Sequence, residues 1–158
     1  MIKYIKLYKI AKQIDSYDKT PNRNKVLEML SKFKPKFLSS GGYKRCFLVK
    51  SNKRVLVFKV GRDVETQYKI YQDLKGKHKL KYAKIYWTTK RCLLQRYCKK
   101  VDVPKNLIKE NKKIAKKLGY SDWRKANIGM FRNEIVVFDL QSAEHKNMKV
   151  CNLEVGKN

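Results

Sequence analysis

The stretch YSDWRKANIGMFRNEIVVFDLQ, residues 120–141, decides the fold of this chain. It opens on a polar segment in which Asp122 and Asn127 lie five residues apart. Two short apolar runs follow, separated by Asn133 and Glu134, and this pattern predicts two strands joined by a turn. The second run is rich in β-branched residues and ends at Asp139. The stretch therefore predicts a loop and then a β-hairpin, with one acidic residue in the loop and another at the end of the second strand.

The residues before this stretch predict a succession of strands and helices. Apolar residues alternate with polar ones in some segments and recur at helical spacing in others. Gly41 and Gly42 form a turn inside the first hairpin, and Gly119 is expected to cap the last helix. The expected elements are strands on both sides of the glycine turn within residues 37–50, a strand at 55–60, a helix at 62–74, strands at 83–88 and 92–97, and a helix at 104–118. The fold class is therefore expected to be α+β.

Two further helices are expected ahead of the sheet, at residues 2–15 and 22–34, and Pro35 ends the second. The first is amphipathic, with lysines between its apolar positions. Such a helix can lie on a membrane surface or pack on the core of its domain, and we favour packing on the core. Its apolar residues are Ile2, Ile5, Leu7, Tyr8, Ala11 and Ile14.

From residue 37 to residue 141 the chain resembles the protein-kinase-like superfamily, especially its small bacterial, phage and atypical members. The catalytic loop of that family has an aspartate five residues before an asparagine, and a metal-binding aspartate ends a strand about a dozen residues later. Asp122, Asn127 and Asp139 match this pattern. The resemblance implies that Asp122 orients the acceptor hydroxyl or accepts its proton, and that Asn127 and Asp139 hold Mg²⁺. Arg124 stands where the family usually has a lysine that steadies the γ-phosphate.

The same resemblance implies a nucleotide site in the first half of the chain. Lys59, in the strand Val55-Leu-Val-Phe-Lys-Val, would contact the α- and β-phosphates of ATP, and Glu65 would be its ion-pair partner. The backbone around Ser40, Gly41 and Gly42 would cover the phosphates. The remaining candidates lie in and after the expected hinge at residues 93–98, whose backbone would bind adenine, and they are Arg96, Cys98 and, for the ribose, Asp102.

Several departures from the family pattern limit what the resemblance implies. Tyr120 and Ser121 replace the usual His-Arg, and Asp139 is followed by Leu-Gln instead of Phe-Gly. Only 19 residues follow Asp139, so the resemblance implies a truncated C-terminal lobe without the helical substrate-binding part. We expect one compact domain, made of a helical extension at 1–36, an N-lobe-like part at 37–98 and a truncated C-lobe-like part at 99–158.

The net charge is unusual, because 40 Lys and Arg residues against 13 Asp and Glu residues give +27. Nucleic acid, an acidic protein and an anionic membrane are the usual partners of such a surface, although lysines can also serve only solubility. Tyrosines and Trp87 lie among the lysines and would suit stacking on bases. No recognised nucleic-acid motif occurs, so such binding would be directed at the backbone. The basic patch on the expected last helix consists of Lys109, Lys112, Lys113, Lys116 and Lys117.

The four cysteines and two histidines argue against a structural zinc site, since no two cysteines form a C-x-x-C pair. Lysines interrupt the first 14 residues, which is atypical of a signal peptide, and no apolar run reaches the roughly 18 residues of a membrane span. We therefore expect free thiols in a reducing cytoplasm, or a virion if the protein is viral.

Three functions remain open from the sequence. The first is an ATP- and Mg²⁺-dependent phosphotransferase of a minimal Ser/Thr protein-kinase-like type. The second is a catalytically weak or inactive kinase-like module that docks on nucleic acid or an acidic protein through its basic surface. The third is a small-molecule phosphotransferase, which is disfavoured because those enzymes need a substrate lobe. The phosphate acceptor and the oligomeric state are left open.

Overall fold

The computed structural model describes residues 1–40, 44–75, 81–100, 102, 104–121, 128–132, 134–137 and 141–142. By its internal contacts the chain forms two units. The first consists of Met1–Tyr68 and Lys84–Tyr97, and the second of Lys69–Ala83 and Cys98–Asn158. Helix α3, Val64–Leu74, begins in the first unit and ends in the second. None of the helices in the described ranges is long and apolar enough to span a membrane.

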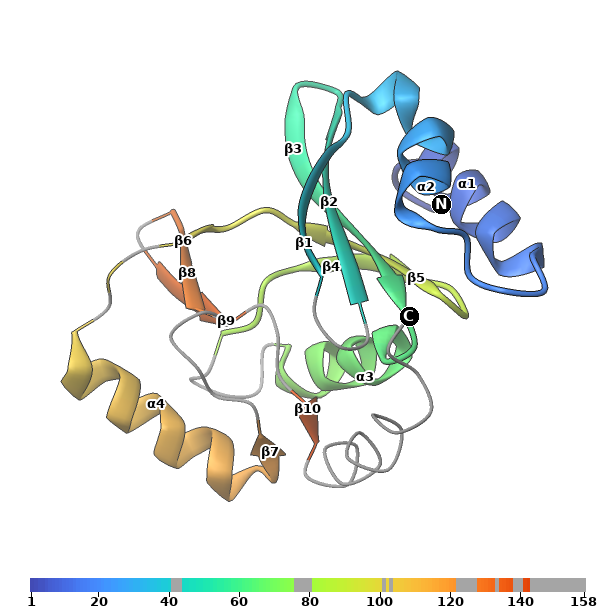
Figure 1. Ribbon diagram of the computed structural model, residues 1–158. Coiled ribbons are helices and arrows are strands. Elements are labelled where there is room, and N and C mark those ends of the chain that lie inside the picture. Colours follow the sequence, from blue (N-terminus) through green and yellow to red (C-terminus); the bar gives the residue numbers. More distant parts are fainter. Residues whose placement is uncertain are drawn as a thin grey trace. The chain divides into compact units, whose positions relative to one another are not determined.

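The first unit contains a five-stranded antiparallel sheet in the order β1-β2-β3-β5-β4 (Figure 1). In the turn between the second and third strands, Asn52 and Lys53 both have positive φ, at 50° and 61°. Two consecutive left-handed residues are typical of a type I′ turn, whose twist suits a tight hairpin. The strands confirm the expected succession, and they are β1 Lys36–Ser40, β2 Lys44–Ser51, β3 Arg54–Gly61, β4 Ile85–Thr88 and β5 Cys92–Arg96.

Helices α1, Ile5–Ser16, and α2, Arg23–Met29, pack on one face of this sheet (Figure 1). A short 3₁₀ turn, Ser31–Phe33, continues from α2 toward the sheet. The interpretation of the first helix as a core-packed element is therefore confirmed. Two of the apolar residues at its start, Ile2 and Ile5, are exposed. The shared core consists of Leu7, Ala11, Ile14, Val26, Leu30, Phe47, Val49, Leu56, Phe58, Val60, Trp87, Cys92 and Leu94.

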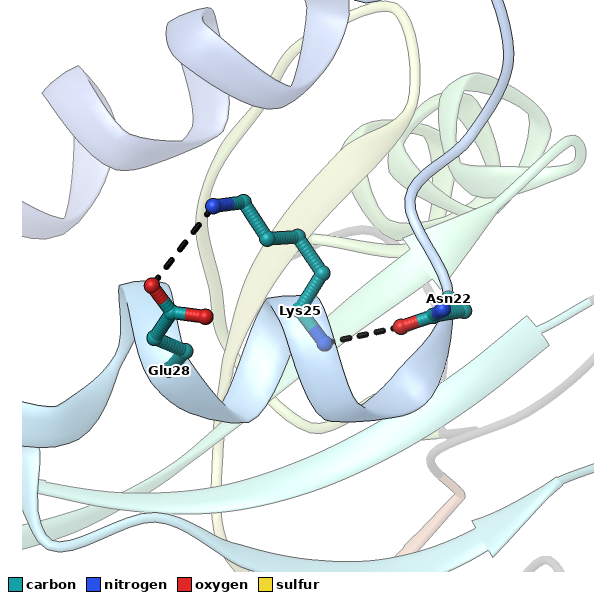
Figure 2. Close-up of polar contacts among 3 residues, drawn as sticks. All are labelled: Asn22, Lys25 and Glu28. Carbon is teal, nitrogen blue, oxygen red and sulfur yellow. Dashed lines mark hydrogen bonds and ion pairs between the residues drawn. The ribbon is translucent and has the colours of Figure 1, made fainter.

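The start of α2 is fixed by a side-chain cap. The Asn22 Oδ1 atom accepts a hydrogen bond of 2.8 Å from the Lys25 backbone N–H (Figure 2). This bond satisfies one of the free N–H groups at a helix N-terminus. One turn further on, Lys25 Nζ lies 3.6 Å from Glu28 Oε1 on the helix surface. The cap makes α2 begin at Arg23, close to the start expected from the sequence.

Asp15, near the end of α1, fastens that helix to the turn between β4 and β5. Its carboxylate accepts hydrogen bonds from Thr89 Oγ1 and from the backbone N–H groups of Lys90 and Arg91, at 3.1, 3.2 and 2.9 Å. The Arg91 guanidinium donates in return to the carbonyl oxygens of Ile14, Tyr17 and Asp18. These contacts hold the helical extension to the sheet by polar bonds as well as by apolar packing.

The second unit contains two small antiparallel sheets and helix α4, Lys105–Lys117. One sheet has the order β6-β8-β9, with β6 at Lys99–Lys100, β8 at Ile128–Phe131 and β9 at Glu134–Val137. The other pairs β7, Tyr120–Ser121, with β10, Gln141–Ser142. The predicted hairpin around Asn133 and Glu134 is confirmed by the pairing of β8 with β9. Gly119, at φ 78°, ends α4 in the left-handed conformation expected of a cap.

The sequence prediction of a loop beginning at Tyr120 is wrong for its first two residues. Tyr120 and Ser121 form β7, and their partners, Ser142 and Gln141, lie some twenty residues further along the chain. Two residues carry no periodic pattern of their own, so a strand this short becomes visible only once its partner is known.

Candidate functional site

The face of the first sheet opposite α1 and α2 carries Lys59. On β3, Leu56, Phe58 and Val60 belong to the core under the helices. Because side chains alternate along a strand, Lys59 lies on the other face. The strand register extends this face across β2, β3 and β5 in two rows. One row is Cys46, Lys59 and Leu93. The other row is Leu48, Val57 and Gln95. The face thus combines a cation with mostly apolar neighbours.

Lys59 is almost fully buried, with 3% of its surface exposed. Its Nζ atom donates to Gln67 Oε1 on α3 at 3.4 Å, and Gln67 itself is completely buried. Lysines are rarely buried unless their charge has polar partners, since transferring an ammonium group out of water is costly. A lysine kept at this position is therefore more than a solubilising surface group.

The structure brings Gln67, and not Glu65, to Lys59. Glu65 lies in the first turn of α3 with an exposed side chain, and within the described residues it forms no ion pair with Lys59. The buried positions around α3 follow the helical period, and they are Asp63, Val64, Gln67, Ile70, Tyr71 and Leu74. Position 65 falls outside this stripe. The expectation that Lys59 pairs with Glu65 is thus wrong for the described residues. A polar residue inside the helix at a position of the buried stripe was the signal that could have identified Gln67.

A buried ion pair lies beside this contact. Lys44 Nζ, at the start of β2, is 3.2 Å from Asp63 Oδ2, just before α3. The two side chains are 8% and 1% exposed. The pair ties the start of β2 to the start of the helix that carries Gln67. Sequence reasoning did not single out either residue.

Replacing Asp63 by Ala is expected to lower the free energy of unfolding by about 3–5 kcal/mol, because it leaves the Lys44 ammonium buried without its counter-ion. Glu65→Ala is the matched control, because Glu65 is an exposed acidic residue two positions away, and it should change stability by less than about 0.5 kcal/mol. Urea unfolding of the three proteins measures the difference. Equal stabilities for the two variants would mean that the Lys44–Asp63 pair is solvated.

The remaining nucleotide-site candidates are spread over both units. Ser40 is the last residue of β1 and lies opposite Arg45, whereas Gly41 and Gly42 lie outside the described residues. The Arg96 N–H donates to the Lys84 carbonyl at 2.8 Å, so this backbone donor is engaged within the first unit. Cys98 is buried beside Ala83, Val136 and Phe131 in the second unit, and Asp102 is exposed.

Two strand pairings enclose the segments that hold the catalytic-loop candidates. Ser121 is paired with Gln141, and Ile128 with Val137. Residues 122–127 run from the first of these pairs to the second, and residues 138–140 run back from the second to the first. Asp122, Arg124, Asn127 and Asp139 belong to these two segments and lie outside the described residues. The residue before each segment is therefore paired with the residue after the other segment.

Val137 is fixed further by the segment before β4. It accepts a hydrogen bond from the Ala83 N–H at 2.7 Å and donates to the Lys81 carbonyl at 2.9 Å. Tyr82 forms a parallel bridge with it. The strand that leads to Asp139 is thus hydrogen-bonded on both sides.

The side chain of Tyr120, in β7, bonds to helix α3. Its hydroxyl donates to Asp73 Oδ2 in the last turn of that helix. Burial, together with this hydrogen bond and the charge of Asp73, raises the pKa of Tyr120. The hydroxyl therefore stays protonated and remains a donor at neutral pH. This contact fixes the residue two positions before Asp122, and sequence reasoning missed it because Asp73 shows no motif.

No group of three metal-binding side chains occurs among the described residues, and the two predicted Mg²⁺ ligands lie outside them. Cys46 and Cys92 are not part of a disulfide. The five lysines of the predicted basic patch are all exposed on α4.

No protein-family model matches the chain, and no curated protein matches it. Among solved structures it is similar to the ternary complex of the aminoglycoside phosphotransferase APH(2")-IIa with streptomycin and ATP, at 19% identity and a TM-score of 0.39. The similarity covers 58% of this chain and 34% of that one, so the chain spans about a third of the length of this neighbour. The interpretation of the site therefore depends on the residues of this chain.

Proposed function

We propose that the chain is a minimal protein-kinase-like phosphotransferase that transfers the γ-phosphate of ATP to a hydroxyl group of the Ser/Thr type. The observation that supports this most is the pair of strand pairings, Ser121 with Gln141 and Ile128 with Val137. They join the two segments in which the predicted acceptor-orienting and metal-binding residues occur. If the spacing of Asp122, Asn127 and Asp139 arose by chance, the strands that flank them would have no reason to pair in this way.

The face around Lys59 suits the nucleotide. The Lys59 ammonium group would attract the negatively charged phosphates of ATP, and charge interactions are stronger at a buried position than in water. Half-buried Leu48 and Val57 on the same face offer apolar surface to a flat base. In this proposal Lys59 binds the α- and β-phosphates, Gln67 orients Lys59, and Ser40 leads into the turn over the phosphates.

Phosphoryl transfer demands mainly positioning and charge stabilisation from the protein. Mg²⁺, when bound with ATP, neutralises charge on the phosphate oxygens, and Asn127 and Asp139 have the oxygen ligands that this ion prefers. Asp122 orients the acceptor hydroxyl and takes up its proton. Arg124 stabilises the γ-phosphate as it leaves ATP.

Thermal unfolding with ATP, in the presence and absence of Mg²⁺, tests the proposal directly. A ligand at 100 times its Kd stabilises the folded state by about 2.7 kcal/mol, so Tm should rise in wild type with ATP and Mg²⁺. Asp139→Asn should lose the Mg²⁺-dependent part of this rise. Asp18→Asn, an exposed aspartate of the first unit, should behave as wild type.

Incubation with γ-labelled ATP supplies the second readout, with the protein itself and a cell lysate as acceptors. Label in wild type that is absent from Asp139→Asn would support phosphotransfer. A Tm that ATP and Mg²⁺ leave unchanged in wild type would reject the nucleotide site altogether.

A further inference from the structure

The lysines of α4 form one continuous face. At 3.6 residues per turn they occupy an arc of about 140° and extend over about 18 Å of helix. Each of them is exposed, and among the described residues none takes part in an ion pair. The lysine face, as we call it, consists of Lys105, Lys109, Lys112, Lys113, Lys116 and Lys117.

The opposite side of α4 is already in use within the second unit. Ala115 is 1% exposed, and Leu107, Ile108 and Ile114 are half-buried. The same helix packs against β7. An amphipathic helix that lies in a membrane must insert its apolar side, and here that side is covered by protein. The lysine face therefore offers charge alone.

We propose that the lysine face of α4 binds the phosphate backbone of double-stranded nucleic acid. Lysine ammonium groups act as point charges that contact phosphates singly, without the fixed geometry of arginine. A row of such charges along a straight helix matches a regular polyanion. The contacts would be to phosphates and not to bases, so binding would be tolerant of sequence.

Two observations favour a nucleic-acid duplex over other acidic partners. Protein–protein interfaces have an apolar or aromatic centre and are depleted in lysine, whereas the lysine face has no apolar residue within it. Single strands need exposed aromatic rings for stacking, and α4 contains no aromatic residue. Trp87, which the sequence offered for this role, is buried against Tyr8 and Phe58 and donates its Nε1–H to the Lys3 carbonyl. The stacking expectation for Trp87 is therefore wrong.

Fluorescence anisotropy with a labelled 25-bp duplex of arbitrary sequence, titrated at several salt concentrations, measures this interaction. Six phosphate contacts predict a slope of log K against log salt of about −5. The triple variant Lys109→Gln, Lys112→Gln, Lys116→Gln should reduce the slope to between about −2 and −3. The matched control replaces three exposed lysines of α1 by Gln, and they are Lys6, Lys9 and Lys12. It lowers the net charge by the same amount as the α4 variant.

A loss of slope in the α4 variant but not in the α1 variant supports the proposal. Equal losses in both variants would overturn it, since the whole surface and not α4 would then attract the duplex. Absence of wild-type binding at low salt would overturn it too. Displacement of the duplex by polyglutamate as readily as by unlabelled duplex would indicate an acidic protein instead. None of these outcomes depends on phosphotransfer, so the two proposals are tested separately.

Discussion

Replacing Asp122 by Asn is expected to reduce the rate of phosphate transfer by about 10²–10⁴-fold, which is the usual contribution of a positioned general base. The amide keeps the shape of the side chain but cannot take up the proton of the acceptor hydroxyl. ATP affinity should change little, because the role proposed for Asp122 is toward the acceptor and not toward the nucleotide. The initial rate of ADP formation with the best acceptor, and the Kd for ATP with Mg²⁺, measure the two effects separately.

Glu134→Gln is the control for this variant. Glu134 is an exposed acidic residue on β9 in the same unit, so its replacement makes an equal change of charge at a residue to which we assign no role. It should leave both the rate and the Kd unchanged. If Asp122→Asn kept the full rate, the acceptor hydroxyl would be activated by another group and the role proposed for Asp122 would be wrong.

Replacing Lys59 by Met is expected to weaken ATP binding and to lower the rate of phosphate transfer by about 10²–10³-fold, the range found when one charge-stabilising donor is removed. Methionine has nearly the same length and suits a buried position, so the strand should keep its packing. The variant removes the cation that is 3% exposed on β3 and leaves its apolar neighbours in place. Isothermal titration with ATP and the rate of ADP formation measure the loss.

Lys50→Met removes an exposed lysine from the neighbouring strand β2 and serves as the control. It should bind ATP as wild type does. Thermal unfolding without ATP distinguishes a defect in folding from a loss of binding, because the Lys59 variant should unfold within a few degrees of wild type. If a folded Lys59→Met protein bound ATP with full affinity, the nucleotide site would not be on this face of the sheet.

Much of the fold was predictable because its signals are local. The turn at Asn52 and Lys53, the cap at Asn22 and the left-handed Gly119 each follow from the conformational preference of one or two residues. The alternating pattern of β3 and the hairpin of β8 and β9 likewise depend on neighbours along the chain. For the candidate site, the sequence singled out Lys59 on the correct strand, and its burial was found in the structure.

Other features depended on residues far apart in the sequence. Among the described residues of α3, Lys59 contacts Gln67 and not Glu65, because packing decides which stripe of the helix faces inward. A shift of two residues rotates a side chain by about 200° around a helix, so a partner assigned from composition alone can fall on the wrong side. The bond between Tyr120 and Asp73 joins residues 47 positions apart and has no local signal.

The sequence by itself determined the succession of helices and strands and the residue types available for phosphoryl transfer. Only the tertiary structure decided that Trp87 lies in the core, that Lys44 pairs with Asp63, and that β7 meets β10. The physical reason is that turns, caps and periodicity are set by short-range conformational energies. Burial and strand pairing depend on which segments, far apart in the sequence, bury apolar surface against each other, and that depends on the whole chain.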